Sequence, residues 1–155
     1  MSISLKKRIQ EMGLVLPQAP KPAGLYRPIL IVGNQLYVSG QGPVSNEGHM
    51  IQGKVGSELD RDQAKEAARQ VGLTMLSTLI HHSPADLKII RIIKVLGMVN
   101  AIPEFESHPH VINGFSELFA EVFGEEFGIG SRSAVGMNLP DNVAVEIEAS
   151  FLIEN

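Results

Sequence analysis

The sequence predicts one α+β domain in which two long helices cover a single face of a small sheet. Its 155 residues are the usual length of one domain, so residues 1–155 are expected to form one unit. Two amphipathic helical segments alternate with strand-like runs, in the order hairpin, helix, strand, helix, hairpin. With 44% hydrophobic and 19% charged residues, the composition is that of an ordinary globular protein.

Residues 1–24 are expected to form a short helix followed by a proline-rich arm. Leu5, Ile9 and Met12 recur at helical spacing, and Gly13 ends that helix. The prolines that follow suit an extended surface segment and not a regular element.

The first two strands are expected at residues 29–32 and 36–39. They flank Gly33-Asn34, where glycine supplies the positive φ of a tight hairpin turn. The polar, glycine-rich stretch over residues 41–56 suits a loop or an irregular strand.

Two amphipathic segments predict the long helices. Asp60 and Gln63 form a capping box that begins a helix of about 20 residues, which ends near His81. A second helix is entered after Pro109, and its apolar stripe extends to Phe123.

Between these helices, residues 89–99 predict a strand that is apolar on both faces. Two helices can cover only one face of a sheet of this size. The second face is therefore expected to be buried against other subunits, and the sequence predicts a homo-oligomer.

The C-terminal segments, residues 132–137 and 143–153, bracket a turn and predict a final hairpin. The odd positions of the second segment are apolar, whereas Glu146 and Glu148 share its opposite face.

If the turn centres near Pro140, antiparallel pairing sets Ala134 opposite Glu146 and Arg132 opposite Glu148. An arginine and two carboxylates would then meet on the face expected at a subunit interface. Arginine can donate two parallel hydrogen bonds to one carboxylate, and glutamate can orient water or transfer a proton. The alternative is a cross-strand ion pair that only aligns the hairpin.

Composition and charge exclude several classes of function. The chain has no cysteine, so it has no disulfide, thiolate metal site or cysteine nucleophile, and a reducing compartment such as the cytoplasm is expected. The five histidines lack an identifiable third ligand, so no metal is expected. A net charge of −4 with 5% aromatic residues argues against nucleic-acid binding. No apolar run reaches the roughly 18 residues that would span a membrane.

From about Leu14 to Ile153, the sequence resembles the Rid family, also called the YjgF-type family and formerly labelled endoribonuclease L-PSP. The residues that carry the resemblance are, in order, Gly24-Leu25-Tyr26, Leu36-Tyr37-Val38-Ser39-Gly40-Gln41, Val111-Ile112-Asn113, Arg132-Ser133, Leu139-Pro140 and Val145-Glu146-Ile147-Glu148-Ala149. The N-terminal helix and arm are similar to those of a divergent branch.

The resemblance implies a chorismate mutase-like fold with a mixed, mostly antiparallel sheet, a homotrimer, and clefts between subunits that hold small carboxylates without a cofactor. RidA-type members hydrolyse enamines and imines such as 2-aminoacrylate, which pyridoxal-phosphate enzymes release, to a 2-oxo acid and ammonia. The same resemblance implies an imine deaminase here, with a non-catalytic trimer that binds 2-oxo acids as the alternative. Ribonuclease activity disagrees with the acidic charge, and chorismate mutase activity follows from fold analogy alone.

Carried over by position, Arg132 would grip the substrate carboxylate and Glu146 would position or activate water. The other residues expected to line the cleft are Tyr26, Ser39, Asn113 and Ala134. Ala134 replaces the cysteine of the family's Arg-Ser-Cys, a position that acts partly through its backbone, and one residue fewer separates Arg132 from Leu139 than in RidA-type members.

Overall fold

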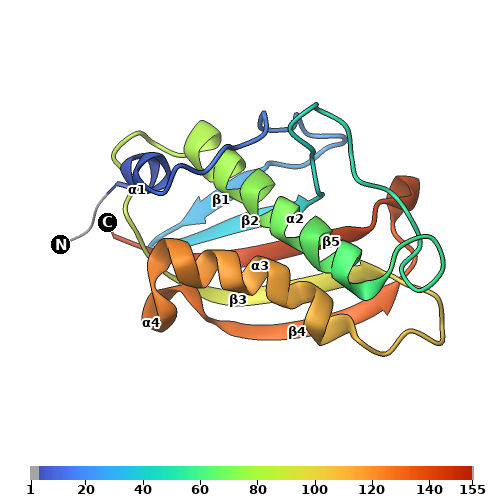
Figure 1. Ribbon diagram of the computed structural model, residues 1–155. Coiled ribbons are helices and arrows are strands. Elements are labelled where there is room, and N and C mark those ends of the chain that lie inside the picture. The colour runs from blue at the N-terminus through green and yellow to red at the C-terminus, as the bar shows by residue number, and fades with distance from the viewer. Residues whose placement is uncertain (1–3, 155) are drawn as a thin grey trace.

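A computed structural model describes residues 4–154 and contains a five-stranded mixed sheet (Figure 1). The strands, in their spatial order, are β1 (Ile29–Val32), β2 (Gln35–Gln41), β5 (Val145–Ile153), β3 (Ile89–Asn100) and β4 (Ser131–Met137). Neighbouring strands are antiparallel except β3 and β4, which are parallel. The expected α+β fold with a mixed, mostly antiparallel sheet is confirmed.

Both long helices, α2 (Arg61–His82) and α3 (His108–Phe123), lie on the same face of the sheet (Figure 1). The predicted capping box begins α2: the Asp60 carboxylate accepts from the backbone of Gln63, whose side chain accepts from the backbone of Asp60. The short helix α4 (Glu125–Gly128) and a 3-10 turn (Pro140–Asn142) complete the helices of the described chain.

The N-terminal helix, α1 (Leu5–Glu11), forms as predicted, with Ser4 as its N-cap and Gly13 at a φ of 66° after its end. Arg8 attaches it to the body of the protein. Its guanidinium donates to the backbone oxygens of Glu121 and Val122, at 3.0 and 3.2 Å, in the last turn of α3. A cation at this end also offsets the negative end of the helix dipole.

The core lies between the sheet and the two long helices. The odd positions of β5 from Val145 to Ile153 are buried there, as their alternation predicted. Phe115 and Phe119 stack with ring centroids 4.2 Å apart, and the ring of Phe151 lies 6.0 Å from that of Phe119. The helical face of the sheet is therefore closed by side chains of this chain.

The prediction of a C-terminal hairpin is wrong. Both segments are strands, but β5 lies between β2 and β3, and β4 pairs in parallel with β3 at the sheet edge. The reason is the connection: α3 crosses over between β3 and β4, which is how neighbouring parallel strands are joined. The chain after β4 then bypasses β3 to insert β5 in the centre, where its apolar face is fully covered.

The opposite face of the sheet carries no helix (Figure 1). Leu96 and Met98 of β3 point to this face, so the strand is apolar on both sides as predicted. The large apolar side chains that remain exposed on the same face are Leu30, Val32, Tyr37, Val135 and Met137. Burial of this face by other subunits stays a prediction.

No helix among residues 4–154 is both long and apolar enough to cross a membrane. The same residues contain no group of three or more histidine, aspartate or glutamate side chains placed to hold a metal ion.

Candidate functional site

Arg132 lies in β4, and its guanidinium is held by α3. Nη1 donates to Asn113 Oδ1 at 2.8 Å and to Ser116 Oγ at 3.1 Å, and Nη2 donates to the Pro109 carbonyl oxygen at 3.4 Å. Asn113 and Ser116 are three residues apart, so they lie on the same side of α3. We call Arg132, Asn113 and Ser116 the arginine cluster.

Arg132 has no carboxylate partner among residues 4–154. None of the ion pairs among residues 4–154 includes it. The side chain is half-buried, and this burial lowers the pKa of Arg132 below its usual value. A partly desolvated cation without a counter-charge favours binding of an anion.

The bonds to α3 also determine which edge of Arg132 is free. Nη1 has both of its hydrogens committed, to Asn113 and Ser116. The remaining donors are Nε and one hydrogen of Nη2, which lie side by side on one edge of the guanidinium. A carboxylate can therefore make a two-point contact with this side edge.

Glu146 lies on the helix-free face of the sheet, against the backbone of β2. A Cβ added to Gly40 would lie 2.6 Å from Glu146 Oε2, so a larger residue at this position would displace the carboxylate from where it lies. The pairing of β2 with β5 shifts register between Val38 and Gln41, which places Gly40 in a bulge. Burial, and then repulsion from Glu148, raises the pKa of Glu146.

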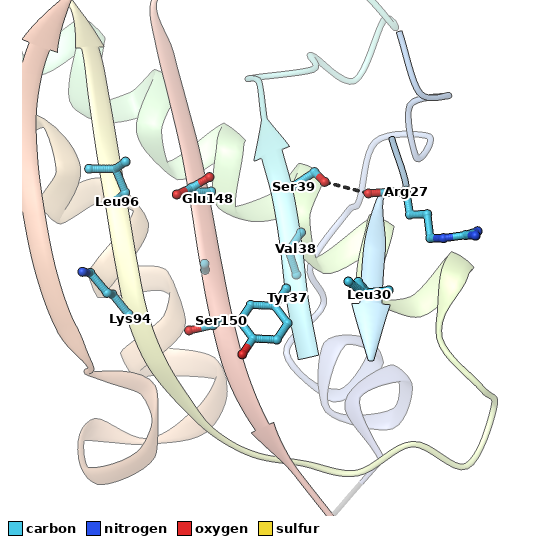
Figure 2. Close-up of a pocket in the computed structure, with 10 residues that line it drawn as sticks. Arg27, Leu30, Tyr37, Val38, Ser39, Lys94, Leu96, Glu148 and Ser150 are labelled. Atoms are coloured by element: carbon cyan, nitrogen blue, oxygen red, sulfur yellow. Dashed lines mark hydrogen bonds between the residues drawn. The ribbon is translucent and has the colours of Figure 1, made fainter. Parts of the chain in front are cut away.

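Ser39 precedes this bulge and is fixed by its own chain. Its hydroxyl donates to the Arg27 carbonyl oxygen at 2.6 Å, drawn as the dashed line in Figure 2. The backbone oxygen of Ser39 accepts from Gln41 Nε2 at 3.0 Å. Tyr26, next to Arg27, is 47% exposed, and its hydroxyl accepts from the backbone N–H of Ala23. We call Ser39, Gly40 and Glu146 the glutamate cluster.

Beside the glutamate cluster the sheet face is hollowed by a depression of about 610 Å³ (Figure 2). Side chains of four strands reach it: Leu30 from β1, Tyr37 from β2, Glu148 and Ser150 from β5, and Lys94 from β3. Its volume is in the range of pockets for small ligands. The cation of Lys94 and the carboxylate of Glu148 therefore both lie on the face of the sheet that no helix covers.

The structure does not bring Arg132 and Glu146 together, which corrects the pairing predicted from the sequence. Arg132 is paired with Val95, which is buried on the helical face, whereas Glu146 is paired with Met98 on the opposite face. Strand β3 also lies between their two strands. The predicted ion pair of Arg132 with Glu148 is absent for the same reason.

The other predicted residues divide between the two clusters. Asn113 contacts Arg132, and Ala134 lies two residues further along the same face of β4, packed at the edge of the core. Ser39 belongs to the glutamate cluster, and Tyr26 is next to Arg27, whose carbonyl oxygen accepts from the Ser39 hydroxyl. Sequence analysis missed Ser116: its spacing of three residues from Asn113 places both on one side of the helix, but does not indicate that β4 lies beside them.

Comparisons with known proteins support one family. A family model described as "YjgF/chorismate_mutase-like, putative endoribonuclease" matches residues 6–145. Protein TCP17 of Trypanosoma cruzi is 37% identical over 149 residues, which cover 95% of this chain and 92% of that protein. A 2-iminobutanoate/2-iminopropanoate deaminase of Dermatophagoides farinae is 30% identical, covering 89% and 93% of the two chains. The crystal structure of Atu1372 from Agrobacterium tumefaciens, a protein of unknown function, matches with a TM-score of 0.82 and 38% identity over 97% of this chain and 92% of that one.

Proposed function

Because the chain belongs to the YjgF/chorismate mutase-like family, the Rid family, we propose that it hydrolyses enamines and imines of the 2-aminoacrylate type to 2-oxo acids and ammonia. The observation that carries the proposal is Arg132, a half-buried cation with a free side edge and no counter-charge among the described residues. The name of the related deaminase of Dermatophagoides farinae supports the same reaction. The cysteine-free chain suits a reducing compartment, and we place the reaction in the cytoplasm.

We further propose that the complete site forms between subunits of a homotrimer. The arginine cluster lies at the β4 edge, and the glutamate cluster lies on the helix-free face. In a ring of three copies, the arginine cluster of one copy can face the glutamate cluster of the next. The exposed apolar side chains of the helix-free face, such as Leu30 and Val135, would be buried by this contact.

The two clusters supply different parts of the reaction. Arg132 binds the substrate carboxylate through its side edge, with Nη1 fixed by Asn113 and Ser116. The enamine first becomes its imine tautomer. A water molecule then forms a bond to the imine carbon as the carbon–nitrogen double bond becomes single, and Glu146 transfers one proton from that water to the nitrogen. Glu146 next accepts the hydroxyl proton of this adduct and passes it to the nitrogen, the carbon–nitrogen bond breaks as the carbonyl forms, and ammonia and the 2-oxo acid leave.

The raised pKa of Glu146 suits this task, because a base whose pKa lies nearer the working pH is the stronger proton acceptor.

The alternative is a trimer that binds 2-oxo acids without turnover, in which Arg132 binds the ligand and Glu146 has no catalytic role. RNA hydrolysis is disfavoured, since the net charge is −4 and no basic patch was found in the sequence.

The direct test couples the protein to a pyridoxal-phosphate-dependent serine or threonine dehydratase and measures release of the 2-oxo acid. We expect the protein to accelerate release of the 2-oxo acid from the imine. Light scattering should give about three times the chain mass of 16.8 kDa. A mass of 16.8 kDa at micromolar concentration would contradict the trimer, and no acceleration with any small imine would favour the binding protein.

A mixing experiment tests whether one site uses two chains. Arg132→Ala and Glu146→Gln chains, each inactive alone, are unfolded, mixed equally and refolded. Each mixed trimer then has one site that holds both Arg132 and Glu146. Random assembly should restore roughly a quarter of the wild-type activity. Activity that stays at the level of the separate variants would show that both residues act from the same chain.

A further inference from the structure

A second hollow, of about 390 Å³, lies where the parallel strands β3 and β4 end and α3 begins. Its wall is formed by Lys54, Ala101, Ile102, Pro103, Phe105, His108, Gly136, Met137 and Asn138. None of the residues that reach into the proposed imine site belongs to this wall. The carboxyl ends of parallel strands, next to the start of the crossover helix, are a common position for ligand sites.

Lys54 brings a positive charge into this hollow and is held there. Its Nζ donates to Asn100 Oδ1 at 3.0 Å and to Asn138 Oδ1. Both acceptors are neutral amides, and none of the ion pairs among residues 4–154 includes Lys54. An ammonium has three hydrogens, so one donor remains after these two bonds.

The carboxylate of Glu58, which lies beside the backbone of Lys54, accepts from other groups. Glu58 Oε1 accepts from the backbone N–H of Lys54 at 3.0 Å, and also from Asn142 Nδ2 at 3.5 Å. No aspartate or glutamate belongs to the wall of the hollow. The ammonium of Lys54 therefore faces a hollow whose wall contains no negatively charged side chain.

The amides that hold Lys54 are themselves anchored. Asn100 is 1% exposed, and its Nδ2 donates to the Gly53 carbonyl oxygen and to Asn142 Oδ1 at 3.0 and 2.9 Å. Asn142 and Asp141 both have a positive φ, of 56° and 54°, a costly conformation for residues other than glycine. The loops that carry Lys54 and Asn138 are thus joined through buried hydrogen bonds, which fixes the ammonium before a ligand arrives.

The opposite side of the hollow combines an imidazole with apolar groups. His108 packs against Gly136, where a Cβ would collide with the ring, and its ring lies edge-on to that of Phe105, with centroids 5.2 Å apart. Ile102 and Met137 add apolar surface. A ligand that matches these walls needs an anionic group for Lys54 and an apolar body for the remainder.

We propose that this hollow is a second anion site, which binds a small organic monocarboxylate with an apolar body. One ammonium and one imidazole match a single negative charge better than a phosphate dianion. The volume admits a ligand of a few carbon atoms beyond the carboxylate. The site is independent of Arg132, so its failure would leave the proposed imine reaction untouched.

The test is a nuclear magnetic resonance titration of the full-length protein with 3-methylbutanoate. The backbone amide of Gly136 reports on this site, and the side-chain amide of Asn113 reports on Arg132. Lys54→Gln, which keeps a donor for Asn100 but removes the charge, should weaken binding at Gly136 by at least about tenfold and leave Asn113 unchanged. Lys54→Arg should keep binding, and Arg132→Ala should affect only the Asn113 response.

Lys88→Gln is the matched control, because it removes the same charge at the other end of β3, about 35 Å away along the strand. If Lys54→Gln fails to fold, Pro103→Glu places a carboxylate at an exposed position of the wall, away from the helix-free face of the sheet, and should also abolish binding. Acetate, which has no apolar body, should bind at least about tenfold more weakly. Equal binding of inorganic phosphate, or equal affinity of wild type and Lys54→Gln, would overturn the proposal.

Discussion

The arginine cluster and the glutamate cluster differ in how much of each is completed by the chain itself. Arg132 has three hydrogen bonds from its guanidinium to α3 and one free edge. Glu146 touches the backbone at Gly40, shares its face with Glu148, and takes part in none of the ion pairs among the described residues. One cluster is rigid and prepared for an anion, whereas the other is a carboxylate on a surface that no helix covers.

For the reaction that we propose, this difference would keep the arginine and the glutamate of one chain from neutralising each other. On opposite faces of the sheet, the two side chains cannot form an ion pair within one chain. In that proposal Arg132 keeps its charge for the substrate, and Glu146 keeps a raised pKa for proton transfer. The predictions below separate the two roles.

The largest effect is expected at Arg132. Arg132→Ala should weaken binding of small 2-oxo acids by about a hundredfold or more, because it removes two charge-assisted hydrogen bonds. Arg132→Lys should weaken it by at least about tenfold, since one ammonium cannot hold α3 and make a two-point contact. Calorimetric titration measures both. Arg69→Lys, at a surface pair with Glu121, is the control. Equal affinity of wild type and Arg132→Lys would make the arginine structural.

Glu146→Gln should reduce turnover by roughly two orders of magnitude or more, while binding of 2-oxo acids persists. The melting temperature separates catalysis from stability. The pKa of Glu146 is raised, so its protonated form is favoured in the folded chain, and stability is lost as the pH rises through that pKa. Glu146→Gln should therefore melt no lower than wild type at pH 7. A lower melting temperature there would mean that the charge is structural.

The sequence predicted those parts of the fold that depend on local pattern. The Asp60 capping box, the Gly33 turn and the alternation along β5 follow from spacing within a few residues, and the structure contains all three. Strand order does not follow from such spacing. A short turn between β4 and β5 favoured a hairpin, but the pairing is decided by α3, which joins β3 to β4 as a parallel crossover.

Side-chain partners were harder still to predict. Ser116 lies on α3, and a serine on a helix is usually a solvated residue. Only the position of β4 beside α3 makes it a partner of Arg132. The resemblance could therefore name Arg132 and Glu146 as the proposed catalytic residues, but the sequence did not indicate that they lie on opposite faces of the sheet.

Ser116 offers a smaller effect within the arginine cluster. Ser116→Ala removes one of the two acceptors of Nη1, so the guanidinium is held less firmly. We expect KM to rise about three- to tenfold with kcat unchanged, because substrate binding weakens but the water chemistry does not. Ser116→Thr should restore the wild-type KM. Glu117→Gln, on the same helix but paired with Lys65, is the control. A fall in kcat equal to the rise in KM would instead indicate a general loss of structure.

The smallest effect is expected from Glu148, which touches neither Arg132 nor the substrate in our proposal. Its negative charge raises the pKa of Glu146, after the larger effect of burial. Glu148→Gln removes this repulsion, so the pKa of Glu146 should fall towards its usual value. The acid limb of the pH profile of kcat/KM, in which activity falls as the base becomes protonated, should therefore move to lower pH. The rate at pH 7 should change by less than about twofold, because repulsion from Glu148 contributes less to the raised pKa of Glu146 than burial does. Glu154→Gln, which removes a carboxylate paired with Lys88, should leave the limb in place. If Glu148→Gln does not move the acid limb, or moves it to higher pH, then Glu146 is not the base that this limb reports.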